Sequence, residues 1–313
     1  MTDDNKPKLQ PIAAKKRKIK IFIAICISAA LLSVLYLTEC FGVWSTLLTL
    51  TNVGSIYEES SGYPLVITVY DVGSANCVLV SCDGYHILID CGMQKFGNDL
   101  SDQLRSFNID RIDLAVLSAH DEKYIGSMCE IADNVGIDRF VTCEGSDGGQ
   151  PEKYKLLLDK LNEKDVRIQY VKSGDKITLG DLSLNVLPPS GEYVTKSGDS
   201  LSLRLAYGDF AMLFLGDTSK KAQTEMLEST EDIRSDVVLA SRQGGWDAVS
   251  EKLLRSVDPD DVVISVEQTD YYPNDKALGL ILNYGCNLYR TDHDGNIAIA
   301  SDGSVYKIIT QRR

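Results

Sequence analysis

The stretch from Leu114 to Ser127 constrains the fold of this chain more than any other. It opens with the apolar run Leu-Ala-Val-Leu, which is typical of a buried strand, and continues through polar residues to Gly126. In α/β proteins, ligands and catalytic groups gather where polar side chains follow the carboxyl end of such a strand. We therefore predict that this turn lies at the functional edge of a mixed α/β domain.

Strand-like and helix-like stretches alternate over the rest of the chain from about residue 65. Short apolar or alternating runs predict strands near residues 65–70, 78–81, 86–90, 138–142, 166–171, 176–179, 182–187, 200–207, 210–215, 236–240 and 261–266, and a final hairpin around the Asp-Gly pairs at 294–295 and 302–303. Helical periodicity predicts helices at 98–107 (with Asn98 as N-cap), 125–135, 152–162, 220–227, 248–256 and 275–284. This order suits two packed sheets with helices on their outer faces, although several α/β folds share it.

The N-terminal part predicts a membrane anchor. Residues 1–20 are polar and basic, and residues 21–37 carry no charge and continue into further apolar positions, so we expect a transmembrane signal-anchor helix over 21–40. A cleaved signal peptide with a small-residue site at Ser28-Ala29-Ala30 is the alternative. The basic tail should stay cytoplasmic, which places a linker (41–64) and a folded domain (65–313) outside the cytoplasm.

Charge is distributed unevenly along the chain. The net charge is −13, yet the first 20 residues contain seven Lys or Arg against two Asp, so the remaining residues carry about −18. Non-specific nucleic-acid binding depends on Lys and Arg that neutralise phosphates. The acidic domain therefore disfavours a nucleic-acid partner, but it does not exclude a small anionic ligand in a local pocket.

The eight cysteines contain no Cys-x-x-Cys pair, which excludes a zinc ribbon. Most of them fall in or beside apolar runs, where cysteine behaves as a small core residue. A disulfide between two of them is an alternative if the domain lies outside the cell.

Four short motifs resemble the metallo-β-lactamase fold, in the version found in the extracellular hydrolase domain of ComEC-type competence proteins. They are Tyr70–Gly73, Leu88–Gly92, Leu213–Asp217 and Tyr289–Asp292 with Gly295, and their order and spacing match the family over nearly the whole soluble part. The resemblance implies an αββα four-layer sandwich, preceded here by the one transmembrane helix.

The metal-binding turn of that family is degenerate in this chain. Alignment on Leu117 and Gly126 places Ala119 at the first His position, Asp121 on the matching Asp, Lys123 at the second Asp and Tyr124 at the last His. Further on, the family's His-His-Gly-Ser turn is Arg242-Gln243-Gly244-Gly245 and its His-Pro is Tyr272-Pro273, whereas Asp217 is retained.

A first hypothesis follows from these replacements. Lys123 and Arg242 would occupy the space of the metal and pair with Asp121 and Asp217, so the domain would be a pseudoenzyme without a cofactor that binds an anionic small molecule or a protein partner. The expected pocket consists of Asp121, Lys123, Tyr124, Asp217, Arg242, Gln243 and Tyr272. Its donors suit a phosphate or another anion. The alternative for Lys123 and Arg242 is that both are solvated surface charges.

A second hypothesis is an active hydrolase of the phosphodiesterase or nuclease type. The resemblance implies Zn²⁺ or Mn²⁺ chemistry, which would need a reduced site built from His120, Asp121 and Asp217. A third hypothesis, a structural module that binds a partner protein through its helical faces, is not separable from the first by sequence.

Overall fold

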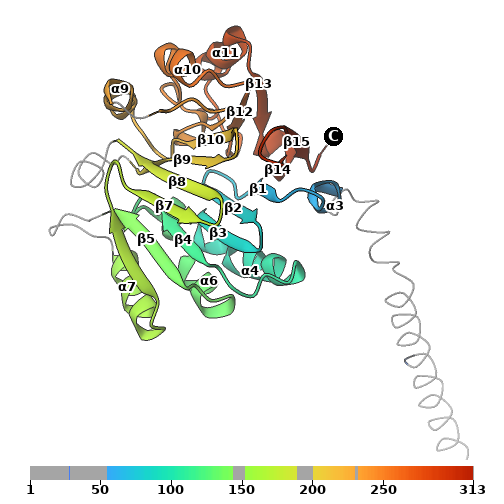
Figure 1. Cartoon of the computed structure of the whole chain (residues 1–313), viewed down its shortest axis with the longest axis vertical. Coiled ribbons are helices and arrows are strands. Elements are labelled where there is room, and N and C mark those ends of the chain that lie inside the picture. The colour runs from blue at the N-terminus through green and yellow to red at the C-terminus, as the bar shows by residue number, and fades with distance from the viewer. Residues whose placement is uncertain (1–27, 29–54, 144–151, 189–199, 230–231, 313) are drawn as a thin grey trace, which may run out of the picture. The chain divides into compact units, whose positions relative to one another are not determined.

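The computed structural model describes residues 28, 55–143, 152–188, 200–229 and 232–312, and the chain from Ile56 onward forms one compact unit (Figure 1). Within the described residues, no helix combines the length and the hydropathy needed to cross a membrane. The span that we predict at residues 21–40 falls outside these residues, apart from Ser28.

Two sheets form the centre of this unit. The first has the strand order β15-β14-β1-β2-β3-β4-β5-β6. Its members are β1 (Leu65–Val69), β2 (Cys77–Cys82), β3 (Tyr85–Cys91), β4 (Leu114–Leu117), β5 (Arg139–Cys143), β6 (Arg167–Val171), β14 (Ile297–Ser301) and β15 (Tyr306–Thr310). The second has the order β13-β12-β11-β10-β9-β8-β7. Its members are β7 (Lys176–Leu179), β8 (Leu182–Leu187), β9 (Ser202–Tyr207), β10 (Phe210–Phe214), β11 (Val237–Leu239), β12 (Asp261–Ile264) and β13 (Asn287–Arg290).

Helices cover the outer face of each sheet (Figure 1). The first sheet carries α4 (Gly97–Ser106), α5 (Glu122–Ile125), α6 (Met128–Asn134) and α7 (Glu152–Glu163); the second carries α9 (Lys220–Glu228), α10 (Glu251–Val257) and α11 (Asp275–Tyr284). Short pieces complete the unit: α3 (Ser55–Ser60), α12 (Thr291–Asp294), η1 (Gln94–Phe96) and η2 (Arg242–Gly244).

Apolar clusters separate the four layers. One cluster takes side chains such as Val116 and Leu203 from both sheets and fills the space between them. A second lies between the first sheet and its helices, and a third between the second sheet and its helices. Each sheet therefore buries both faces, and the expected αββα sandwich is confirmed.

Parallel pairing in the middle of each sheet places strand ends together. Strands β3 to β6 run parallel in the first sheet, and β10 to β13 run parallel in the second. The polar turns that follow β3, β4, β10, β11 and β12 are therefore at the carboxyl edges of the two sheets, where α/β folds carry their sites.

Three predictions about local structure are wrong. The helix expected at 125–135 begins later, as α6 at Met128, because Ser127 with a ψ of 0° interrupts the helical backbone after α5. At Gly126 a Cβ atom would lie 2.4 Å from the backbone nitrogen of Gln94. Helix α4 begins at Gly97, so Asn98 is not its N-cap. The Asp294-Gly295 pair does not close a hairpin, because β13 and β14 belong to different sheets.

The boundary between linker and domain also differs from expectation. Part of the expected linker forms α3, whose Ile56 is 1% exposed and packs with Ala298, Ala300 and Ile309 on the outer face of β14 and β15. The Lys307 ammonium donates to the carbonyl of Glu59 at 2.8 Å. The folded unit therefore begins before residue 64, because this edge of the sheet would otherwise expose apolar side chains to water.

Candidate functional site

The side chains of the turn after β4 that align with the family's ligand positions differ in burial. Asp121 is exposed and caps α5, where its carboxylate accepts from the backbone N–H of Lys123 at 3.0 Å. Lys123 is half-buried and forms no ion pair with Asp121 or Asp217 among the described residues. Tyr124, in contrast, is fully buried. The first half of the expected charge pairing is thus not formed.

His120 turns away from the other candidate ligands. Its ring stacks on Tyr154 of α7, with 3.9 Å between the centroids, and its Nε2 lies 3.1 Å from the Thr142 hydroxyl. That hydroxyl already donates to the carbonyl of Leu117, so Nε2 carries the proton and donates to Thr142. Burial lowers the pKa of His120 to about 4, which keeps the ring neutral at physiological pH.

A β-bulge in β3 places the buried carboxylate of Asp90 at the base of the site. In the β2–β3 pairing Val78 faces Ile89 and Cys77 faces Cys91, so Asp90 is the extra residue, and its φ is +55°. Its side chain is 2% exposed and accepts from the backbone N–H and the hydroxyl of Ser118, at 2.8 and 2.7 Å. Burial raises the pKa of Asp90 to about 7, and the nearby charge of Asp217 adds to the effect.

The turn after β11 holds a cation against two carboxylates. The Arg242 guanidinium lies 3.8 Å from Asp217 and 3.3 Å from Asp247, and its Nε donates to the Asp217 carbonyl at 3.2 Å. Arg242, Gln243 and Gly244 all have positive φ values, near 50°, 51° and 73°. Left-handed backbone is costly for side-chain-bearing residues and is concentrated at functional sites. The structure thus brings Arg242 and Asp217 together, with Asp247 as an additional partner.

Two buried donors between the halves of the site lack partners. The Tyr124 hydroxyl and the Gln243 side-chain nitrogen reach no hydrogen-bond partner within the part of the chain that the structure describes. Burial raises the pKa of Tyr124 well above its usual value; the charges of Asp217 and Asp90 add to this, and the adjacent Gln243 amide opposes it. Buried polar groups without partners are rare and mark places where a water or ligand binds.

Beneath these groups lies a small cavity between the sheets. Its volume is about 10 Å³, room for about one water molecule. Asn76, Asp90 and Ser118 supply its polar lining, and the remaining wall is mostly apolar. One ordered water with polar partners fits this space, and a larger ligand does not.

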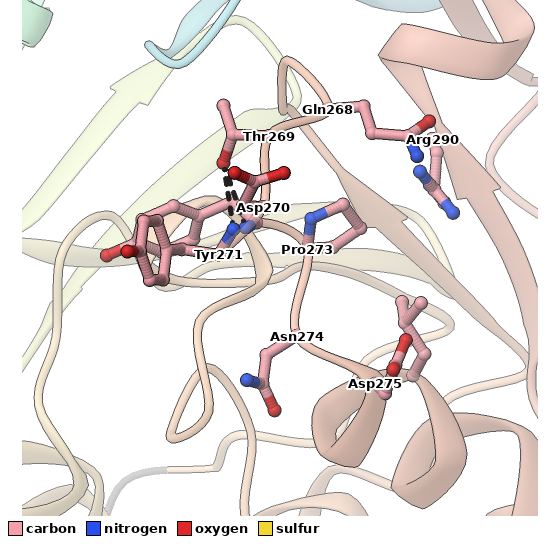
Figure 2. A pocket seen from close by; sticks show the side chains of 10 residues that line it. Gln268, Thr269, Asp270, Tyr271, Pro273, Asn274, Asp275 and Arg290 are labelled. Atoms are coloured by element: carbon pink, nitrogen blue, oxygen red, sulfur yellow. Dashed lines mark hydrogen bonds between the residues drawn. The ribbon is translucent and has the colours of Figure 1, made fainter.

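Tyr272 belongs to a separate loop that borders a larger hollow. Residues 268–275, with Leu278 and Arg290, line a cavity of about 300 Å³ (Figure 2). The Thr269 hydroxyl accepts from the backbone N–H groups of Tyr271 and Tyr272, as the dashed lines in Figure 2 show. The Asn274 N–H donates to the carbonyl of Gly244 at 2.8 Å, which ties this loop to the Arg242 turn.

The residues of the described chain do not fit a metal ion. No group of three or more His, Cys, Asp or Glu side chains in it is placed to hold a cation. The three candidates diverge: His120 donates to Thr142, Asp121 caps a helix, and Asp217 faces a guanidinium. Zn²⁺ and Mn²⁺ sites need ligands that converge, with unprotonated ring nitrogens where histidine binds.

Sequence reasoning missed three members of this region: Asp90, Ser118 and Asp247. Asp90 lies inside the matched motif Leu88–Gly92, and a buried-strand carboxylate was a usable signal. Ser118 directly follows an apolar strand, which is also a recognisable position. The pairing of Asp247 with Arg242 depends on the left-handed turn, which no pattern in the sequence reports.

Comparison with known proteins supports the family resemblance. No family model matches the chain. ComE operon protein 3 of Bacillus subtilis (strain 168) is 26% identical over 197 residues, which are 62% of this chain and 25% of that protein. The chain therefore spans about a quarter of the length of this relative.

Solved structures support the fold. The diiron β-hydroxylase CmlA from Streptomyces venezuelae matches with a TM-score of 0.55 and 14% identity, over 76% of this chain and 54% of CmlA. The metallo-β-lactamase fold protein YhfI from Bacillus subtilis matches with a TM-score of 0.49 and 11% identity, over 72% of this chain and 96% of YhfI. The CmlA match supports the layered fold, and the similarity to ComE operon protein 3 supports the ComEC-type relationship.

Proposed function

We propose that this chain is a membrane-anchored, ComEC-related protein whose metallo-β-lactamase-like domain is not catalytic and binds an anionic small molecule or a protein partner. One observation carries the proposal: the Arg242 guanidinium lies against Asp217, one of the two retained metal-ligand positions, and also against Asp247. A fixed cation at this place supplies the positive charge that a metal would otherwise bring.

The ion pairs of Arg242 make metal binding unfavourable. Asp247 is only 8% exposed, so its carboxylate depends on the guanidinium for compensation. A divalent ion entering beside Asp217 would meet the positive charge of Arg242 and would have to displace it. The remaining ligands would then come from side chains that point elsewhere.

Four polar groups would then receive the ligand. Lys123 is half-buried at the edge of the site, Arg242 is partly exposed, and the Tyr124 hydroxyl and the Gln243 amide are buried donors without partners among the described residues. Charge-assisted and neutral donors together suit a phosphate or carboxylate group. The acidic surface of the domain disfavours nucleic acid as this ligand.

The location follows from the N-terminal sequence. A basic cytoplasmic tail (1–20), a span (21–40) and an extracytoplasmic domain form a single-pass protein of the cell membrane. The relationship to a ComE operon protein is compatible with a role at the cell surface.

Metal analysis of the purified full chain tests the proposal. After incubation with Zn²⁺ and Mn²⁺ and removal of free ions, we expect less than about 0.1 metal per chain in elemental analysis. The Arg242→Gln variant removes the guanidinium from both carboxylates and is the variant in which metal retention should rise; Arg255→Gln, which removes a surface partner of Glu251, is the matched control. About one metal per wild-type chain, lost in Asp217→Ala, would instead establish a reduced hydrolase site.

Calorimetry with inorganic pyrophosphate tests the binding site. We expect saturable binding that Lys123→Ala and Gln243→Ala each weaken several-fold, because each loses one donor. Lys155→Ala, on the exposed face of α7, should leave it unchanged. Equal affinity in all four proteins would contradict the assignment of the ligand to this site.

A further inference from the structure

Two cysteines face each other directly beneath the site. Cys77 on β2 pairs with Cys91 on β3, and both are fully buried in the cluster between the first sheet and its helices. The bulge at Asp90 creates this arrangement. Without the extra residue, Cys91 would follow the alternation of β3 and point to the opposite face of the sheet.

The backbone pattern shows which kind of pair this is. The N–H of Gly92 donates to the carbonyl of Asn76 at 2.8 Å, so the hydrogen bond flanks the two cysteines and does not join them. Cys77 and Cys91 therefore form a non-hydrogen-bonded antiparallel pair, in which the Cα atoms are about 4.5 Å apart and the side chains approach most closely. That separation falls within the range that a disulfide spans.

We propose that Cys77 and Cys91 form a cross-strand disulfide in the mature protein. The inference rests on the extracytoplasmic location proposed above, because only an oxidising compartment maintains such a bond. Both cysteines are thiols in the structure, and Cys91 Sγ donates to the Tyr124 carbonyl at 3.1 Å. Rotation of the Cys91 side chain towards Cys77 exchanges this contact for the S–S bond.

The bond forms by exchange with a disulfide oxidant, R–S–S–R. One cysteine thiolate attacks a sulfur of the oxidant, breaks its S–S bond and releases RSH; the second cysteine then attacks the mixed disulfide, forms the Cys77–Cys91 bond and releases the other RSH. The oxidant takes up two electrons and both thiol protons. A small disulfide or a dithiol oxidoreductase outside the cytoplasm serves as this reagent.

Oxidation must occur before the domain closes. Burial raises the pKa of Cys77 and of Cys91 far above the usual value, and neither side chain reaches solvent, so the folded pair is inert to exchange. The proposed disulfide is therefore a structural bond made during folding and is not a switch.

The other cysteines of the described chain provide internal controls. Cys82 and Cys143 pair across the strands with residues that are not cysteines. The Cys286 thiol donates to the carbonyl of Pro259. Cys129 is the one competitor, because it is half-exposed on α6 and close enough to Cys91 to influence its pKa.

Differential alkylation of the full chain isolated from membranes tests the bond. Thiols are blocked with N-ethylmaleimide under denaturing conditions, the protein is then reduced and labelled with iodoacetamide, and peptides are identified by mass spectrometry. We expect iodoacetamide on Cys77 and Cys91 only, and a joined peptide containing both in an unreduced sample. N-ethylmaleimide on both residues, or a bond from Cys91 to Cys129, would overturn the proposal.

A second label separates this result from the location. In a Ser304→Cys variant, placed on the exposed turn between β14 and β15, a membrane-impermeant maleimide added to intact cells should react if the domain is outside. If the introduced cysteine is labelled but Cys77 and Cys91 are reduced, the proposed disulfide is wrong and the extracytoplasmic location is supported. Absence of labelling shows that the location itself is wrong.

Thermal unfolding provides a readout that does not depend on labelling. A disulfide that closes a loop of about 15 residues should raise Tm by about 6 to 12 °C, so wild-type protein refolded with reductant should lose this amount. Cys77→Ala should show no dependence on reductant, whereas Cys143→Ala, another buried cysteine, should keep the wild-type difference. An equal Tm for wild-type protein refolded with and without reductant would contradict the bond.

Discussion

The turns after β4 and β11 occupy corresponding places in the two sheets but hold their polar side chains in different ways. The turn after β11 keeps a charged centre, in which Arg242 contacts Asp217 and Asp247 on a left-handed backbone. The turn after β4 begins a helix, in which Asp121 caps α5 and His120 stacks on Tyr154. The two turns thus use their polar side chains differently: one holds opposite charges together, and the other uses its side chains to cap a helix and to stack on a ring.

Glycine substitutions should separate the two turns most strongly. Gly126→Ala places a Cβ atom 2.4 Å from backbone that cannot move aside, so we expect it to destabilise the domain by about 3 kcal/mol or more in urea unfolding. Gly244→Ala meets side chains of Ile264 and Pro273 at 3.0 Å and a φ of +73°, and it should cost less. Gly279→Ala, in open space on α11, is the control and should be neutral or stabilising.

Two titrating groups on the first sheet should make stability depend on pH in opposite directions. Asp90 has a folded pKa of about 7 against an ordinary value of 3.8, so its contribution is complete below pH 4 and is lost as pH rises to 7. His120 has a folded pKa of about 4 against 6.5, so its contribution is complete above pH 6.5 and is lost as pH falls to 4.

Each effect amounts to about 1.4 kcal/mol per pH unit where it acts alone, and the two nearly cancel between pH 4 and 6.5. Asp90→Asn should therefore unmask a stability that rises with pH in this window, and His120→Asn one that falls, in denaturant titrations at each pH. A flat profile in both variants would show that neither group is buried in the way that the structure describes.

Removal of the two cations should affect stability unequally. Arg242→Gln removes the guanidinium from Asp217 and from the buried Asp247, and we expect a loss of about 2 kcal/mol, reduced from the fully buried case by the partial exposure of Arg242. Lys123→Ala should change stability by less than about 0.5 kcal/mol, because no carboxylate faces it among the described residues. Equal losses of unfolding free energy in Arg242→Gln and Lys123→Ala would contradict this difference between the two turns.

Loss of the helix cap should have a smaller effect than loss of the Arg242 ion pairs. Asp121→Ala should destabilise by about 1 kcal/mol, since the first N–H groups of α5 lose their acceptor. Asp121→Asn should restore most of this loss, because the amide oxygen accepts the same hydrogen bond. Chemical denaturation of the two variants tests this. If Asp121→Asn is as unstable as Asp121→Ala, the negative charge of Asp121 stabilises the domain in addition to the capping hydrogen bond.

The sequence predicted the architecture because its signals were local and repeated. Helix α11 has the bounds 275–284 that the periodicity predicted, and the structure shows Asn274 as its N-cap and Gly285 in the left-handed position after it. The order of the matched motifs placed the polar turns at the strand ends. These features depend on a few neighbouring residues, which a pattern can report.

The site was harder to predict because it depends on register and dihedral angles. A bulge decides that Asp90 faces Ser118, and nothing in Leu-Ile-Asp-Cys reveals which residue is extra. Likewise, a displacement by one residue carries His120 to α7, and a φ of +50° brings Arg242 to Asp247. Small changes along the chain thus redirect whole side chains.

The early start of the folded unit also limits how far the domain can travel. Helix α3 anchors the chain at Ile56 against β14 and β15, so the predicted tether between the end of the span at residue 40 and the domain has about 15 residues. Fully extended, these reach roughly 50 Å. On the membrane anchor proposed above, ligands or partners would meet the domain within this distance of the membrane surface, and diffusion of partners within that plane would raise their effective concentration around the site.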